Sequence, residues 1–141
     1  MFVNQLPQLI WRATLLSTCL FAFWKGRWPE RAVAICFLLA SFASPLVLNT
    51  RDWLDPQWGV LIVDGALLVA LLVATLKTNR VWILFATAFQ LLSVVIHVAM
   101  AVDRSVAPLP YRRGLVIWSY MTLVALAVGT WQVSRRPSGA D

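Results

Sequence analysis

Charged residues are scarce in this sequence, at 13% of 141 residues, whereas about 25% is usual in soluble domains. Hydrophobic residues make up 60% of the chain, and the mean hydropathy is +0.75. This composition excludes an ordinary soluble domain, and the length suits one compact unit. The sequence therefore predicts an integral membrane protein.

Histidine and cysteine are nearly absent as well. The chain has one histidine, His97, and two cysteines, Cys19 and Cys36. The cysteines lie in apolar runs without the Cys-x-x-Cys spacing of a metal or redox site, and one histidine supplies too few ligands for haem. The sequence also has no phosphate-binding glycine loop, no Gly-x-Ser-x-Gly and no His-Glu-x-x-His. We therefore expect no metal, no other cofactor and no enzyme activity.

Basic residues outnumber acidic ones by twelve to six, which gives a net charge of +6. They are scattered in twos and threes between apolar runs instead of forming one face, so nucleic-acid binding is not expected. Their positions between the runs are typical of signals that set the topology of a membrane protein.

Five apolar runs approach the length of about 20 residues that a membrane-crossing helix needs. They predict an all-α bundle of five transmembrane helices in one domain, 1–134, followed by a short cytoplasmic tail, 135–141. The expected spans are 6–24, 31–48, 57–76, 81–102 and 114–133. Because Arg12 interrupts the first run, the alternative is four spans preceded by an interfacial N-terminal helix.

Five spans with the N-terminus outside place seven basic residues on the cytoplasmic side and four on the outer side. The seven are Lys25, Arg27, Arg31, Lys77, Arg80, Arg135 and Arg136, and the four are Arg51, Arg104, Arg112 and Arg113. Since basic residues are retained in the cytoplasm during insertion, this bias predicts a cytoplasmic C-terminus. Tryptophans agree, because Trp24, Trp28, Trp82 and Trp131 fall at the predicted cytoplasmic ends, where indole rings prefer the headgroup level.

The small size, short loops and basic tail make the chain similar to small inner-membrane proteins of bacteria. The bacterial inner membrane is therefore the expected location. Within the bundle, Pro45 is expected to kink the second helix, while Pro108 and Pro110 are assigned to the last loop. Ala125 and Gly129, four residues apart, are expected to let a neighbouring helix approach closely.

Polar groups inside the spans are the candidate functional residues. Arg12, Asp64 and His97 are each expected about 10 Å from the outer ends of their helices. Ser119 and Tyr120 on the last span fall near the same depth. One interpretation is structural, with Arg12 neutralising Asp64 and the other groups completing hydrogen bonds. The other is a proton-accepting or ligand-binding site made by Asp64 and His97.

The functional expectation follows from how few functional groups the chain offers. The leading hypothesis is a non-enzymatic accessory or assembly subunit of a larger membrane complex. The alternative is a small transporter or proton-coupled carrier that uses the polar layer around Asp64 and His97. The expected partners are the lipid bilayer and either a larger complex or further copies of this chain.

Overall fold

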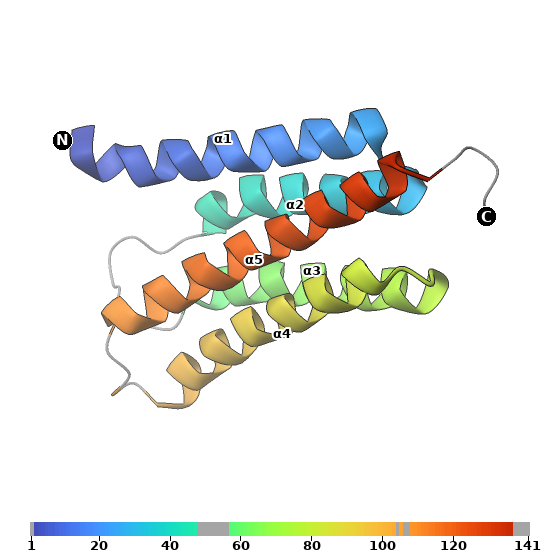
Figure 1. The fold of residues 1–141 in the computed structure, drawn as a ribbon. Coiled ribbons are helices and arrows are strands. Elements are labelled where there is room, and N and C mark those ends of the chain that lie inside the picture. Colours follow the sequence, from blue (N-terminus) through green and yellow to red (C-terminus); the bar gives the residue numbers. More distant parts are fainter. Residues whose placement is uncertain (1, 48–56, 104, 106–107, 137–141) are drawn as a thin grey trace.

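The computed structural model describes residues 2–47, 57–103, 105 and 108–136, and in this part of the chain all regular structure is helical (Figure 1). The five helices are α1 (Phe2–Lys25), α2 (Trp28–Val47), α3 (Trp58–Lys77), α4 (Val81–Val102) and α5 (Pro108–Ser134). Each contains a segment long and apolar enough to cross a membrane. The all-helical prediction is confirmed, while insertion and orientation stay predictions.

The helix boundaries lie within four residues of the predicted spans, except at the start of α5, which lies six residues earlier. The fourth helix has the predicted bounds, because Arg80 and Asp103 delimit its apolar run. The assignment of Pro108 and Pro110 to a loop was wrong, because both lie in the first turn of α5. Proline is accepted there, since the first N–H groups of a helix have no intrahelical partner. Pro45 lies in the last turn of α2, and the kink expected there stays a prediction.

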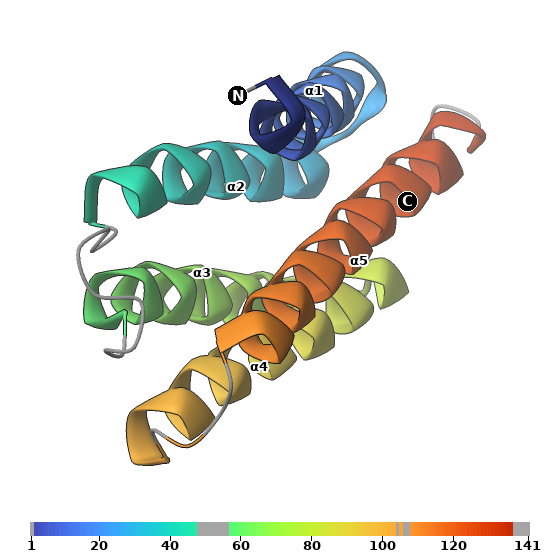
Figure 2. The same ribbon diagram turned by 90° about the vertical axis from the view of Figure 1, so that its left-hand side faces the viewer.

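The helices form a closed circuit in which each packs on its neighbours in the chain and α5 returns to α1 (Figures 1 and 2). Helix α5 also touches α2, whereas α1 and α3 do not pack on each other. At one end of the bundle α2 and α4 finish and α3 and α5 start, and we call it the "α4–α5 end". The opposite end holds the α1–α2 turn, and we call it the "α1–α2 end" (Figure 1).

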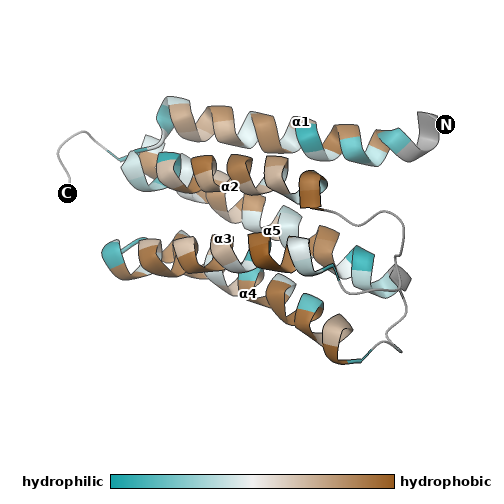
Figure 3. Cartoon of the chain, turned by 180° about the vertical axis from the view of Figure 1, so that it is seen from behind, coloured by the Kyte–Doolittle hydropathy of each residue, from teal (hydrophilic) through white to brown (hydrophobic). Residues whose placement is uncertain are grey.

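Hydrophobic residues predominate along the helices, and hydrophilic residues are more frequent toward the helix ends and on the N-terminal half of α1 (Figure 3). Leu46, Leu76 and Val102 are each more than four-fifths exposed. Apolar surface of this kind is unfavourable in water and suits lipid. The core lies between the helices and includes Leu15, Phe37, Leu71, Ile83 and Leu126.

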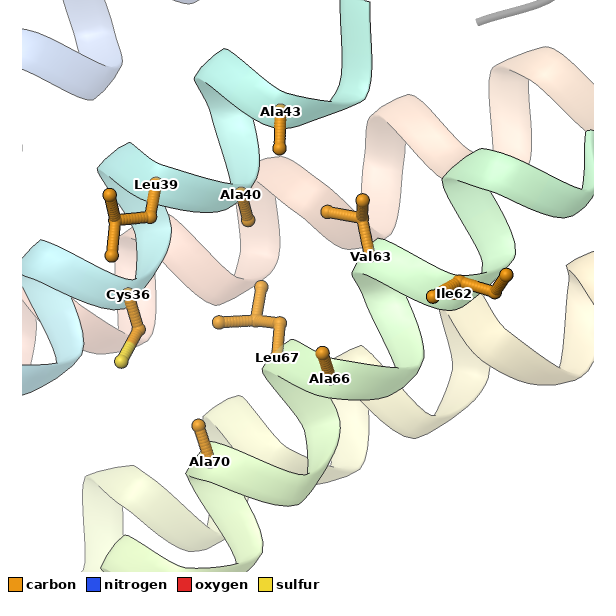
Figure 4. A pocket seen from close by; sticks show the side chains of 9 residues that line it. All are labelled: Cys36, Leu39, Ala40, Ala43, Ile62, Val63, Ala66, Leu67 and Ala70. Atoms are coloured by element: carbon orange, nitrogen blue, oxygen red, sulfur yellow. The ribbon is translucent and has the colours of Figure 1, made fainter. Parts of the chain in front are cut away.

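Small residues act differently at two of the helix contacts. Between α2 and α3, Ala40, Ala43, Ala66 and Ala70 border an open apolar groove of about 320 Å³ (Figure 4). Between α4 and α5, Gly129 lies against the ring of Trp82, and a side chain at this position would overlap the ring. Gly129 therefore makes room for an aromatic side chain of the neighbouring helix.

Candidate functional site: a hydrogen-bonded chain of Asp64, His97 and Tyr111

Three helices bring polar side chains together near the α4–α5 end of the bundle. Asp64 lies six residues after the first residue of α3, which is about 9 Å along the helix, and His97 lies five residues before the end of α4. Tyr111 belongs to the first turn of α5. Because α3 and α5 begin where α4 ends, the three side chains reach the same level of the bundle.

The three side chains form a continuous hydrogen-bonded chain. His97 Nε2 lies 3.1 Å from Oδ2 of Asp64, and His97 Nδ1 lies 2.6 Å from the hydroxyl oxygen of Tyr111. His97 is 3% exposed and Tyr111 6%, while the side chain of Asp64 is 20% exposed. The imidazole is thus held at both nitrogens and shielded from its surroundings.

The chemistry of the three groups fixes which atoms donate. An ionised carboxylate only accepts, so the hydrogen between Asp64 and His97 belongs to Nε2. When the imidazole is neutral, Nδ1 accepts the hydroxyl hydrogen of Tyr111. When the imidazole is protonated, Nδ1 donates to the phenol oxygen, and the hydroxyl hydrogen is released to another acceptor. The direction of the Tyr111 hydroxyl therefore depends on the proton at His97.

One polar side chain on the same face of α4 bonds the backbone of Asp64, and one hydroxyl on this face has no hydrogen-bond partner among the described residues. Gln90 donates from Nε2 to the backbone oxygen of Asp64 at 3.2 Å. One turn earlier on α4, the hydroxyl of Thr87 donates to the carbonyl of Ile83 at 2.7 Å, which is the usual hydrogen bond of a hydroxyl side chain in a helix. Ser93, between Gln90 and His97 on this face, is 2% exposed, and its Oγ has no partner in the part of the chain that the structure describes.

An open pocket of about 190 Å³ lies beside this chain, and its lining surface is almost wholly apolar. Residues from α3, α4 and α5 contribute to it, including His97 and Tyr111. The lining residues are Gln57, Val60, His97, Tyr111, Arg112, Leu115 and Val116. His97 and Tyr111 thus connect Asp64 to a space that a small molecule can enter.

The structure brings together two of the predicted site residues and separates the others. Asp64 and His97 are in contact, as the proton-site hypothesis requires. Arg12 is exposed on α1, a helix that does not pack on α3, so the ion pair with Asp64 is not formed. Tyr120 makes an edge-to-face contact with Trp11 at 5.0 Å between ring centroids, and Ser119 is half-buried next to it.

Sequence reasoning missed Tyr111 as a site residue. Pro108 and Pro110 suggested a loop, which would have placed Tyr111 outside the bundle. The sequence signal that could have shown this is that the first turn of a helix accepts proline. An α5 that starts at Pro108 puts Tyr111 in the first turn of the helix, where its hydroxyl bonds His97.

Another acid, Glu30, lies at the α1–α2 end. Its side chain is fully buried, with Oε2 accepting from the backbone N–H of Arg27 at 3.0 Å and Oε1 from the indole N–H of Trp82 at 3.1 Å. Glutamate at the third position of a helix often accepts a hydrogen bond from the backbone N–H of the N-cap residue. Glutamate at this position is the sequence signal that could have predicted the contact. Trp82, expected at the headgroup level, is buried instead.

The remaining candidates for ligand binding are limited. In the described ranges no three His, Cys, Asp or Glu residues are grouped as a metal site requires. Cys19 and Cys36 are free thiols, and Cys19 Sγ lies 3.7 Å from the carbonyl oxygen of Ala34.

Beyond the end of α4, hydrogen bonds from the side chain and backbone of Ser105 hold the pKa of Asp103 below its ordinary value.

No protein-family model, curated protein sequence or solved structure matches this chain. The function is therefore inferred from the geometry of the site.

Proposed function

We propose that this protein is a small proton-coupled carrier that takes up and releases a proton at the chain of Asp64, His97 and Tyr111. The observation that carries the proposal is that His97 is bonded at one ring nitrogen to a carboxylate and at the other to a phenol. Both bonds lie within segments long and apolar enough to span a membrane. Ionisable groups at such positions typically belong to ion or proton pathways.

The identity of the partner of Asp64 favours this function over a purely structural role. An aspartate neutralised by arginine is balanced permanently, because a guanidinium does not lose its proton. Histidine changes charge between about pH 5 and pH 8. Pairing with His97 instead of Arg12 therefore joins the carboxylate of Asp64 to a group that can gain and lose a proton.

Proton transfer follows from the two arrangements of the Tyr111 hydroxyl. A proton arriving from the pocket is accepted by the phenol oxygen while the hydroxyl hydrogen passes to Nδ1 of His97. The resulting imidazolium is stabilised by the carboxylate of Asp64 at 3.1 Å. The reverse transfer returns a proton to the pocket, so Tyr111 is the group through which His97 exchanges protons.

A rapid pH jump applied to proteoliposomes tests this function without knowledge of the solute. A proton that moves from the aqueous phase to a site inside the membrane displaces charge, so the wild-type protein is expected to give a transient current. His97→Gln and Asp64→Asn are expected to abolish it. Asp103→Asn, which removes an acid beyond α4, is the matched control and is expected to keep the current. A current of equal size in His97→Gln would rule out the site.

One feature of α1 supports the accessory-subunit hypothesis. Gln5, Gln8, Arg12, Leu15, Cys19 and Ala22 recur at alternating spacings of three and four residues and form one helical stripe. Leu15, Cys19 and Ala22 are buried in the bundle, whereas Gln5, Gln8 and Arg12 are exposed. A stripe that changes from apolar and buried to polar and exposed is suited to an external partner.

Arg12 defines the chemistry of that partner. It lies in the candidate span Gln5–Lys25, and no acidic side chain among the described residues forms an ion pair with it. A charge in a membrane segment requires compensation, so an acidic group on a neighbouring subunit would complete it. The test is the native mass in lipid discs. A stoichiometric partner that is lost in Arg12→Leu and kept in Arg27→Leu supports this second function.

A further inference from the structure

Positive charge is concentrated at the α1–α2 end of the bundle, where α1, α3 and α5 finish and α2 and α4 start (Figure 1). Seven of the chain's twelve basic residues belong to these helix ends and the turns beside them. They are Lys25, Arg27, Arg31, Lys77, Arg80, Arg135 and Arg136. Among the residues that the structure describes, Glu30 is the only acid at this end. The α1–α2 end is therefore strongly cationic.

Glu30 does not neutralise the surface of this end. Its side chain is fully buried, and its two carboxylate oxygens accept hydrogen bonds from the backbone N–H of Arg27 and the indole N–H of Trp82. The exposed basic side chains here are Lys25, Arg31, Lys77, Arg135 and Arg136. In the described ranges none of these five forms an ion pair with an acid. Their charge is therefore available to an external anion.

Two of the exposed cations lie over exposed indole rings. Lys25 Nζ lies 4.7 Å from the ring centroid of Trp24, and the guanidinium carbon of Arg135 lies 4.1 Å from that of Trp131. Trp24 is 76% exposed and Trp131 is 49% exposed. Exposed indole rings at the ends of membrane helices prefer the level of the lipid headgroups. These rings therefore hold both cations where headgroup phosphates would be.

The two cation–indole pairs lie at a similar level of the bundle. Trp11 on α1 contacts Tyr120 on α5, and the two helices run in the same direction (Figure 1). Lys25 follows Trp11 by 14 residues and Arg135 follows Tyr120 by 15, so each lies about 21 Å beyond this contact. A flat layer of phosphate groups, such as the surface of a lipid leaflet, can therefore meet both cations at once.

We propose that the α1–α2 end binds the headgroups of anionic phospholipids, with Lys25 and Arg135 as the principal contacts. The helices are long and apolar enough to cross a membrane, which places their cationic ends beside the headgroups of one leaflet. Lysine and arginine near such a surface are attracted to anionic lipids. This surface lies at the opposite end of the bundle from Asp64, His97 and Tyr111, so the inference does not depend on proton exchange.

The test measures how strongly the protein selects an anionic lipid. The full chain is placed in phosphatidylcholine vesicles, and electron paramagnetic resonance measures the immobilised fraction of spin-labelled phosphatidylglycerol or spin-labelled phosphatidylcholine. The wild-type protein is expected to prefer phosphatidylglycerol by about fivefold, the effect of one cation near an anionic surface. Salt at about 1 M shortens the Debye length to about 3 Å and is expected to remove most of this preference.

Substitutions locate the preference on the molecule. Lys25→Gln/Arg135→Gln is expected to lower it to about twofold or less, and Arg135→Gln alone is expected to lower it in part. Arg113→Gln also removes one exposed arginine, but at the α4–α5 end. It is the matched control for Arg135→Gln and is expected to keep the wild-type preference.

Three results would overturn the assignment. The first is an unchanged preference in Lys25→Gln/Arg135→Gln, and the second is an equal loss in Arg113→Gln and Arg135→Gln. The third needs only the wild-type protein, and is equal immobilisation of the two lipids or a preference that does not change with salt. Equal immobilisation would leave an acidic protein surface, instead of a lipid, as the partner of this end.

Discussion

The phenol of Tyr111 and the imidazole of His97 are joined by a 2.6 Å hydrogen bond between the hydroxyl oxygen and Nδ1, and their ring planes are inclined by 82°. Both rings are buried. The bond joins α5 to α4 and completes a chain that starts at Asp64 on α3. The imidazole of His97 thus links three helices at the α4–α5 end.

Tyr111→Phe separates the structural and proton-exchange roles of this bond. The substitution keeps the ring and leaves Nδ1 of His97 without its partner, so the free energy of unfolding is expected to fall by about 1 to 2 kcal/mol. The pH-jump current is expected to slow or vanish, because the route from the pocket to His97 is removed. Tyr120→Phe, whose ring contact with Trp11 is retained, is the control. A Tyr111→Phe protein with an unchanged current would show that His97 exchanges protons by another route.

Glu30→Gln tests the buried acid at the α1–α2 end. The amide presents an N–H₂ group to one of the two donors, Arg27 N–H or Trp82 Nε1–H, so one hydrogen bond is lost. We expect the free energy of unfolding to fall by about 1.5 to 3 kcal/mol, as for hydrogen bonds to charged groups. Denaturant unfolding in mild detergent measures it, with Trp82→Phe and the double variant closing a cycle. Strictly additive effects would contradict a direct Glu30 and Trp82 interaction.

Gly129→Ala and Gly65→Ala form a matched pair on two helices. A methyl group at position 129 overlaps the ring of Trp82, whereas one at position 65 meets nothing within 4 Å. The first substitution is expected to destabilise the protein by about 1 to 3 kcal/mol through overpacking. The second is expected to stabilise it by up to about 1 kcal/mol through helix propensity. Thermal unfolding in lipid discs distinguishes them, and equal melting temperatures would contradict the α4 and α5 packing.

Ser93→Ala tests the unpaired hydroxyl beside the site. Removing a buried group that has no hydrogen-bond partner relieves its desolvation penalty, so the free energy of unfolding is expected to rise by about 1 kcal/mol. Thr87→Ala is the contrasting variant, since the Thr87 hydroxyl bonds both Ile83 and Thr75. We expect Thr87→Ala to lower stability. A loss of stability in Ser93→Ala as well would show that a molecule such as water satisfies Ser93 Oγ.

The sequence was sufficient to predict five helices and two of the three residues in the hydrogen-bonded chain. Apolar runs set the helix lengths, and Asp64 and His97 are conspicuous because ionisable groups are costly inside such runs. The partner of Asp64 was not predictable in the same way. Depth along a helix can be counted, but Arg12 and His97 share that depth, and only the packing circuit places α4 instead of α1 beside α3.

Tyr111 and Glu30 were missed because both lie at helix starts. Tyr111 follows two prolines that suggested a loop and that stand in the first turn of α5. Glu30 stands in the first turn of α2. A buried acid at position 30 also depends on an indole donor from Trp82, 52 residues further along the chain. Contacts of this kind arise from tertiary packing, and the local sequence does not encode them.

The most direct measurement of the central claim is ¹⁵N NMR of His97 in lipid discs, because both ring nitrogens report their hydrogen-bond partners. His97 is the chain's only histidine, so ¹⁵N-histidine labelling reports one imidazole without assignment. We predict that the neutral ring carries its hydrogen on Nε2 and that Nδ1 has the chemical shift of a hydrogen-bond acceptor, which Tyr111→Phe changes and Tyr120→Phe does not. A ring that carries its hydrogen on Nδ1, or an Nδ1 shift that is unchanged in Tyr111→Phe, would contradict the chain of Asp64, His97 and Tyr111.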